Sequence, residues 1–172
     1  MSGRIREVGG LVAVAMGLAT AGNSAALAQQ GDLKARLVGG WVLADESLTF
    51  PDGRTVKSWG DKPFGYLSFD AGGSFAQILL RSDLPKFQTR TDGTPEQNDA
   101  VAKGAIAYFG TYAAKPNENA VAMSIVGSSF ATFNGTVSER AIAFASDDQF
   151  VMTMRVPNSG VRTDLTWRRA GK

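Results

Sequence analysis

Eight side chains have the chemistry to contact a small molecule: Tyr66, Ser68, Gln77, Arg81, Tyr108, Met123, Met152 and Met154. Methionine thioethers adapt to irregular apolar shapes. Hydroxyl and amide groups direct hydrogen bonds, and a guanidinium can hold a carboxylate by two parallel bonds. Six of them have a structural alternative, since methionines also fill cores, buried tyrosines also bond to backbone carbonyls, and Arg81 can pair with the nearby Asp83. The sequence alone leaves these alternatives open.

The residue types that are missing exclude several kinds of chemistry. The chain has 172 residues, no His and no Cys. A Ser-His-Asp triad, a thiol nucleophile, a disulfide, and a zinc or iron–sulfur site built on these ligands are therefore excluded. No dense Asp/Glu cluster predicts an oxygen-ligand metal site, and we expect no cofactor. A net charge of +2, from 18 Lys+Arg against 16 Asp+Glu, argues against nucleic-acid binding driven by phosphate neutralisation.

The first 28 residues have the organisation of a secretory signal peptide. Arg4 and Arg6 precede an apolar stretch over residues 11–19, and Ala26-Leu27-Ala28 supplies a small-x-small cleavage pattern. A membrane anchor is the alternative, but the apolar stretch is much shorter than the roughly 20 residues of a span. We therefore expect cleavage after residue 28, a mature domain over residues 29–172 without a membrane span, and a periplasmic or secreted location.

The mature chain is predicted to consist mainly of short strands. Turn signals separate nine of them, over residues 41–48, 54–58, 64–70, 74–80, 108–114, 120–126, 136–144, 150–156 and 162–169. One helix is predicted over residues 95–107, with Thr94 as its N-cap and Pro95 in its first turn. Residues 86–90, before this helix, form either a lid or an ordinary surface connection.

Eight to nine strands at this spacing are typical of an antiparallel sandwich or a closed barrel. Several strands carry large residues on both faces. In a barrel, one face would line the interior and the other would meet solvent or the packed helix. Asp45 and Glu46 are neighbours on one strand, so they should face opposite sides and cannot act as paired carboxylates. The pattern favours a barrel only slightly.

Five stretches, in this order, resemble the bacterial and fungal lipocalin-like domain family: Gly39-Gly40-Trp41, Gly60 to Phe69, Thr94-Pro95-Glu96, Ala107 to Tyr112, and Leu165 to Arg169. The resemblance covers about residues 33–169. It implies an all-β fold, an antiparallel lipocalin-like (calycin) β-barrel of 8–9 strands with one inserted α-helix. Gly72-Gly73 stands where the family usually has Asp-Gly, which changes the turn and not the pocket.

The resemblance also implies structural roles for Trp41 and Arg169. Trp41 would plug one end of the barrel, and Arg169 would lie against its ring, a contact worth about 0.5–2 kcal/mol. The alternative is that one of them touches a ligand.

Three functions remain compatible with the sequence. The first is an exported barrel that binds a small hydrophobic or amphipathic molecule in its interior. The second is a cofactor-independent enzyme of the cyclase or isomerase type, in which Tyr66, Tyr108, Arg81 and Asp45 would move protons or stabilise an anion. The third is a structural or interaction protein of the cell envelope, which would show an exposed apolar patch. The sequence determines neither the ligand nor the oligomeric state, and an enzyme is the less favoured reading.

Overall fold

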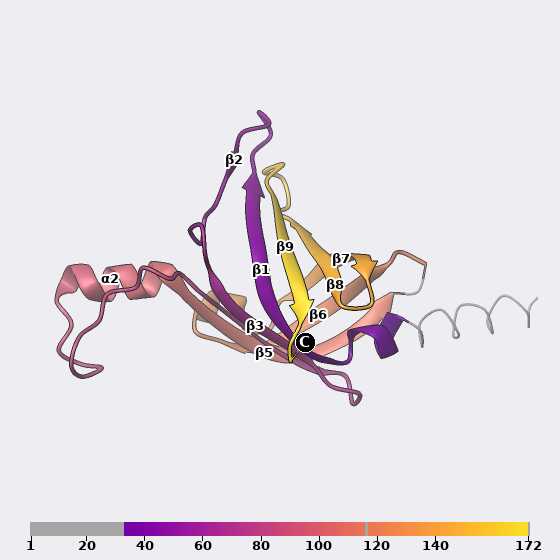
Figure 1. Cartoon of the computed structure of the whole chain (residues 1–172), viewed down its shortest axis with the longest axis horizontal. Helices are drawn as coiled ribbons and strands as arrows, with labels where there is room; N and C mark the ends of the chain where they lie inside the picture. Colours follow the sequence, from indigo (N-terminus) through magenta and orange to yellow (C-terminus); the bar gives the residue numbers. More distant parts are fainter. Residues whose placement is uncertain (1–32, 116, 172) are drawn as a thin grey trace, which may run out of the picture.

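The computed structural model describes residues 33–115 and 117–171, which form one barrel with a projecting helix (Figure 1). The expected signal peptide lies outside these residues. All nine strands belong to one sheet: β1 (Gly39–Thr49), β2 (Thr55–Val56), β3 (Phe64–Phe69), β4 (Ser74–Leu80), β5 (Ala105–Lys115), β6 (Ala120–Ser128), β7 (Val137–Ser146), β8 (Gln149–Arg155) and β9 (Arg162–Arg169).

Pairing of the first and last long strands closes the sheet. From β3 to β9 each strand pairs antiparallel with its successor along the chain. β1 pairs with β3 on one side and with β9 on the other, from Trp41 opposite Arg169 to Thr49 opposite Arg162. β2 adds two residues beside the far end of β1. The closed antiparallel barrel is confirmed, and the sandwich alternative is wrong.

Alternation along each strand fills the barrel interior. In β4, Phe75, Gln77 and Leu79 are buried, whereas the residues between them are exposed, as a period of two requires. The largest fully buried side chains include Trp41, Trp167, Phe69, Phe150, Leu67, Met123 and Met152. Side chains therefore fill much of the barrel, and the barrel is not an empty tube.

One end of the barrel is covered. Residues 33–37 form a helical turn that buries Leu33 and Leu37. The Trp41 indole Nε1 donates a hydrogen bond of 2.8 Å to the Leu37 carbonyl. The Trp41 ring also meets Phe150 edge-on at 4.6 Å between centroids. We call this the closed end, and the opposite end, where β3 and β5 begin, the open end.

Helix α2 (Pro95–Gly104) starts where predicted and ends earlier. Thr94 and Gln97 form a reciprocal capping box at its start. The prediction that it continues to residue 107 is wrong, because Ala105 already pairs with Leu80 in the β4–β5 ladder. Strand β5 accordingly begins at Ala105, before the predicted start at residue 108.

The inserted helix does not cover the barrel wall. Figure 1 shows that α2, in the connection between β4 and β5, projects away from the barrel. Gly104 is its one buried residue, and most of the others are exposed. A polar, exposed helix contributes little to the core, so barrel closure does not depend on it.

The β5–β6 bulge requires glycine at position 110, and this requirement can be tested. The register shifts between Phe109 and Gly110, and a Cβ added to Gly110 would overlap the backbone carbonyl of Ser124. We expect Gly110→Ala to reduce the free energy of unfolding by about 1–3 kcal/mol or more, as overpacking does. Urea denaturation measures the loss.

Gly127→Ala is the matched control on the adjoining strand. A Cβ there would lie 2.7 Å from the Phe109 ring, and that side chain is 55% exposed and free to move. The reduction in the free energy of unfolding caused by Gly127→Ala should therefore be much smaller. Equal losses in the two variants would contradict the close backbone approach at Gly110.

Candidate functional site

The barrel interior holds polar atoms that nothing in the described structure satisfies. Gln77 is 1% exposed, yet neither its amide oxygen nor its amide nitrogen has a hydrogen-bond partner. The Trp167 indole Nε1 is buried and equally unpartnered. Most buried polar groups in folded proteins are paired, and the exceptions require an explanation. A bound molecule is one such explanation.

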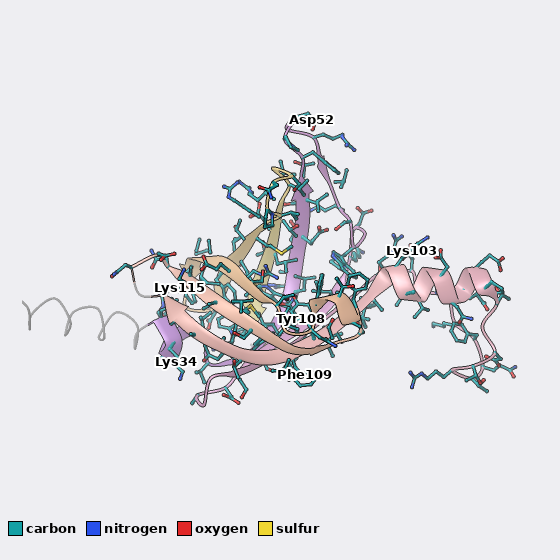
Figure 2. All side chains as sticks on the ribbon, turned by 180° about the vertical axis from the view of Figure 1, so that it is seen from behind. Lys34, Asp52, Lys103, Tyr108, Phe109 and Lys115 are labelled. Carbon is teal, nitrogen blue, oxygen red and sulfur yellow. The ribbon has the colours of Figure 1, made fainter. Side chains whose placement is uncertain are left out.

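Tyr108 lies beside Gln77. The two residues are directly opposite in the β4–β5 ladder. The Tyr108 ring meets Phe75 at 6.1 Å and Phe133 at 6.4 Å, both edge-on. Figure 2 shows Tyr108 and its neighbour Phe109 on opposite faces of β5. Tyr108 therefore belongs to the inner wall.

A buried arginine acts on Tyr108 from β7. Arg140 is 7% exposed, and its Nη1 donates a hydrogen bond to the Ser138 hydroxyl. Burial raises the pKa of Tyr108, and the Arg140 charge together with its hydrogen bond partly offsets the rise. The phenol therefore stays protonated at neutral pH. We call Gln77, Tyr108 and Arg140 the inner polar cluster.

Arg140 has no carboxylate partner among the described residues. The other charged side chain in the interior, Glu46, is 1% exposed, and it already accepts hydrogen bonds from the Ser58 hydroxyl at 2.7 Å and the Trp59 amide at 3.3 Å. Glu46 thus ties the β2–β3 connection to the barrel. No carboxylate of the described residues therefore lies within ion-pair distance of the Arg140 guanidinium.

A bulge directs Glu46 inward. The β1–β9 register shifts between Leu43 and Asp45, so the residues that face inward change from odd to even positions. Asp45 points outward and pairs with Lys57, which lowers the pKa of that carboxyl. Asp45 and Glu46 face opposite sides, as alternation predicted.

The eight predicted contact residues separate into two groups. Five lie on inner faces: Gln77, Tyr108, Met123, Met152 and Met154. Met123 and Met152 are fully buried, whereas Met154 is half-buried toward the open end. The remaining three, Tyr66, Ser68 and Arg81, lie outside the barrel.

Tyr66 and Arg81 each make contacts outside the barrel. Tyr66 is 47% exposed and shares the outer face of β3 with Ser68, and its hydroxyl occupies the space that a side chain at Gly40 would need. Arg81 pairs with Asp83 near the base of α2 through two hydrogen bonds. Of the four residues named for the enzyme hypothesis, only Tyr108 is inside, so the structure does not bring them together.

Sequence reasoning missed several inner residues with polar groups, among them Glu46, Arg140 and Trp167. The sequence contained a signal for Arg140, because it alternates in step with the apolar residues Ile142 and Phe144 and so lies on the same face of its strand. Glu46 had no comparable signal, since the bulge before it reverses the parity.

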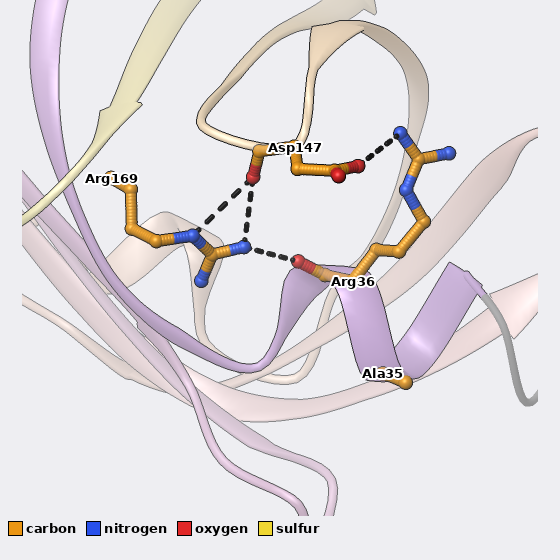
Figure 3. Close-up of a pocket in the computed structure, with 4 residues that line it drawn as sticks. All are labelled: Ala35, Arg36, Asp147 and Arg169. Atoms are coloured by element: carbon orange, nitrogen blue, oxygen red, sulfur yellow. Dashed lines mark hydrogen bonds and ion pairs between the residues drawn. The ribbon is translucent and has the colours of Figure 1, made fainter.

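A hollow of about 500 Å³ lies outside the barrel at the closed end, lined by Ala35, Arg36, Asp147 and Arg169 (Figure 3). The Arg169 guanidinium lies 4.1 Å from the Trp41 ring centre. It donates to the backbone carbonyls of Arg36 and Asp147, both at 3.0 Å, and of Val38 at 3.1 Å.

These closed-end groups satisfy one another. Arg36 also pairs with the Asp147 carboxylate at 3.4 Å. The contrast with the interior is clear, since the guanidinium at the closed end is fully engaged by the protein. This hollow therefore has the character of a structural closure.

Residues 33–115 and 117–171 give no support for a metal site or for a membrane-spanning helix. They contain no cluster of three or more acidic ligands able to hold a metal ion. They also contain no helix that is long and apolar enough to cross a bilayer.

The chain belongs to a family of lipocalin-like domains. The family's model, described as a lipocalin-like domain, matches residues 38–170, which is most of the chain. No curated protein matches it.

Among solved structures, three designed barrels are similar in shape only loosely. A de novo designed fluorescence-activating β-barrel matches with TM-score 0.42 and 16% identity, over 80% of this chain and 97% of that chain. The redesigned barrel mFAP1 bound to DFHBI matches with a TM-score of 0.40 and 16% identity, over 80% of this chain and 98% of that chain. EF1p2_mFAP2b bound to DFHBI matches with a TM-score of 0.37 and 14% identity, over 82% of this chain and 97% of that chain. Overlaps this loose have no bearing on the function of the present chain.

The closed end predicts a specific requirement for arginine. Arg169→Lys keeps the charge but loses the forked donors that hold three carbonyls and the flat group over Trp41. We expect the free energy of unfolding to fall by about 1–3 kcal/mol, measured by urea denaturation. The adjacent Arg168 is exposed, and Arg168→Lys should stay within about 0.5 kcal/mol of the parent. Similar effects of both changes would show that the Arg169 contacts contribute little.

Proposed function

We propose that this protein binds a small hydrophobic or amphipathic molecule in the interior of the barrel. The observation that carries the proposal is Gln77, whose amide is sealed inside a closed barrel with both polar atoms unpartnered. Leaving such a group unsatisfied costs about 1–3 kcal/mol, and a ligand polar group would remove that cost. Membership of the lipocalin-like family supports the same reading.

The proposed ligand enters at the open end. The middle of the barrel is filled by buried side chains such as Met123 and Met152. Toward the open end Trp59, Ile106 and Met154 are half-buried, so this region is the less tightly sealed. Methionine side chains can change rotamer at low cost, which would let the interior adapt around a guest.

A neutral hydrophobic dye, N-phenyl-1-naphthylamine, tests the proposal. We expect a saturable rise in fluorescence on binding, and native mass spectrometry of gently purified protein should show an added mass. Met154→Trp would narrow the interior near the open end and should weaken dye binding about tenfold, equivalent to ~1.4 kcal/mol. Arg155→Trp adds the same ring to the adjacent exposed position and should leave binding unchanged.

Circular dichroism would establish that both variants are folded. A folded protein with neither saturable dye binding nor an added mass would refute the proposal. Equal weakening by Met154→Trp and Arg155→Trp would place the dye outside the barrel.

An outward apolar row favours a second candidate, a protein-interaction role. Val42 pairs with Tyr66, and Tyr66 pairs with Ile78, all on outer faces. Phe109 on β5 and Phe64 on β3 are 55% and 62% exposed. A folded protein that binds no dye but sediments as a stable dimer would support this candidate over the first.

We further propose that the chain is exported and cleaved after Ala28. The support is the arrangement of the basic start, the apolar stretch and the Ala26-Leu27-Ala28 pattern. After expression of the full chain in a bacterium, intact mass should correspond to a protein that begins at Gln29. Ala28→Arg should block cleavage and leave the longer mass. An unprocessed mass for the parent chain would contradict the proposal.

A further inference from the structure

We infer that the interior site takes a monocarboxylate, whose head group would bind the inner polar cluster of Gln77, Tyr108 and Arg140. This inference rests on the proposed function and names the class of ligand for the same site. It depends on three strands, β4, β5 and β7, which bring these residues together. The apolar remainder of the ligand would lie among the surrounding aromatic and methionine side chains.

Charge is the first argument. Arg140 is nearly buried, and the described residues pair it with the Ser138 hydroxyl and the neutral Tyr108 but with no carboxylate. The one buried acid, Glu46, is held by Ser58 and the Trp59 backbone. A buried guanidinium that contacts no carboxylate is unfavourable. A ligand carboxylate would supply the missing negative charge and would accept two parallel hydrogen bonds from the planar fork.

Hydrogen-bond capacity is the second argument. Tyr108 lies opposite Gln77 in the ladder and within the influence of Arg140, so it joins the other two. Its hydroxyl remains protonated and can donate, and the Gln77 amide nitrogen is a donor without a partner. A carboxylate has lone pairs for about four such donors, so one head group could engage all three side chains.

The number of charges selects a carboxylate over a phosphate. Among the described residues, the buried polar and charged side chains are Glu46, Gln77, Arg140 and Thr163, and Arg140 is the single cation of that set. One cation balances a monoanion, whereas a phosphate monoester carries nearly two negative charges at neutral pH. The neutral donors Tyr108 and Gln77 match the remaining lone pairs of a carboxylate.

The apolar surroundings fit an aliphatic chain. Phe75 and Phe133 contact the Tyr108 ring. Ile106 precedes Tyr108 on the same face of β5 and is packed against the core. An alkyl chain that runs from the inner polar cluster toward the open end would therefore pass mainly over carbon.

Two probes of equal length separate the head group from the tail: decanoic acid and 1-decanol, each competed against N-phenyl-1-naphthylamine. We expect the acid to bind the parent protein about tenfold more tightly than the alcohol, as a charge-assisted bidentate pair would give. Arg140→Gln should abolish this preference and leave alcohol binding close to that of the parent. Arg155→Gln, at an exposed position on β8, removes the same charge from the surface and should retain the preference.

Gln77→Leu gives a second variant that does not depend on the tolerance of Arg140 to change. It removes an unsatisfied buried amide, so it should fold at least as stably as the parent, and it should weaken the acid several-fold more than the alcohol.

The outcomes distinguish the two proposals. If acid and alcohol displace the dye equally well from the parent, or if Arg140→Gln keeps the preference, the carboxylate inference is wrong while the binding function stands. If neither probe competes and the dye itself does not bind, the proposed function fails as well.

Discussion

Closure of the sheet between β1 and β9 is the constraint on which the remaining structure depends. Hydrogen bonding between these strands removes both edges, so the inward residues of all the long strands become one enclosed set. The same pairing places Arg169, the last residue of β9, opposite Trp41 near the start of β1. The cation–aromatic contact at the closed end therefore joins the two strands that close the barrel.

Closure also determines the energetic character of the interior. A polar side chain on an inward position cannot turn to solvent, and it must find a partner inside. Glu46 does so through the β2–β3 connection, whereas Gln77 does not. The two buried charges, Glu46 and Arg140, thus differ, because Glu46 accepts hydrogen bonds from the Ser58 hydroxyl and the Trp59 amide, whereas Arg140 is in contact with no carboxylate among the described residues.

The two ends of the barrel differ in the same sense. At the closed end the guanidinium of Arg169 is engaged by backbone carbonyls and by the Trp41 ring. Toward the open end the residues are half-buried, and helix α2 projects away and does not cover the barrel. This asymmetry favours entry of the proposed ligand from the open end. It also indicates that the residues around the hollow of Figure 3 stabilise the fold.

The sequence by itself determined the number and approximate positions of the strands, the start of α2 and, through the resemblance, the barrel, because turn and capping chemistry is local and survives without tertiary context. It did not determine which face of a strand points inward, since β3 is apolar on both faces and Tyr66 proved to be outside. Nor could it foresee the bulge that turns Glu46 inward, or the pairing that ends α2 at Gly104. Only the closed tertiary structure decided these, because alternation defines two faces, while register and closure determine which one is sealed from water.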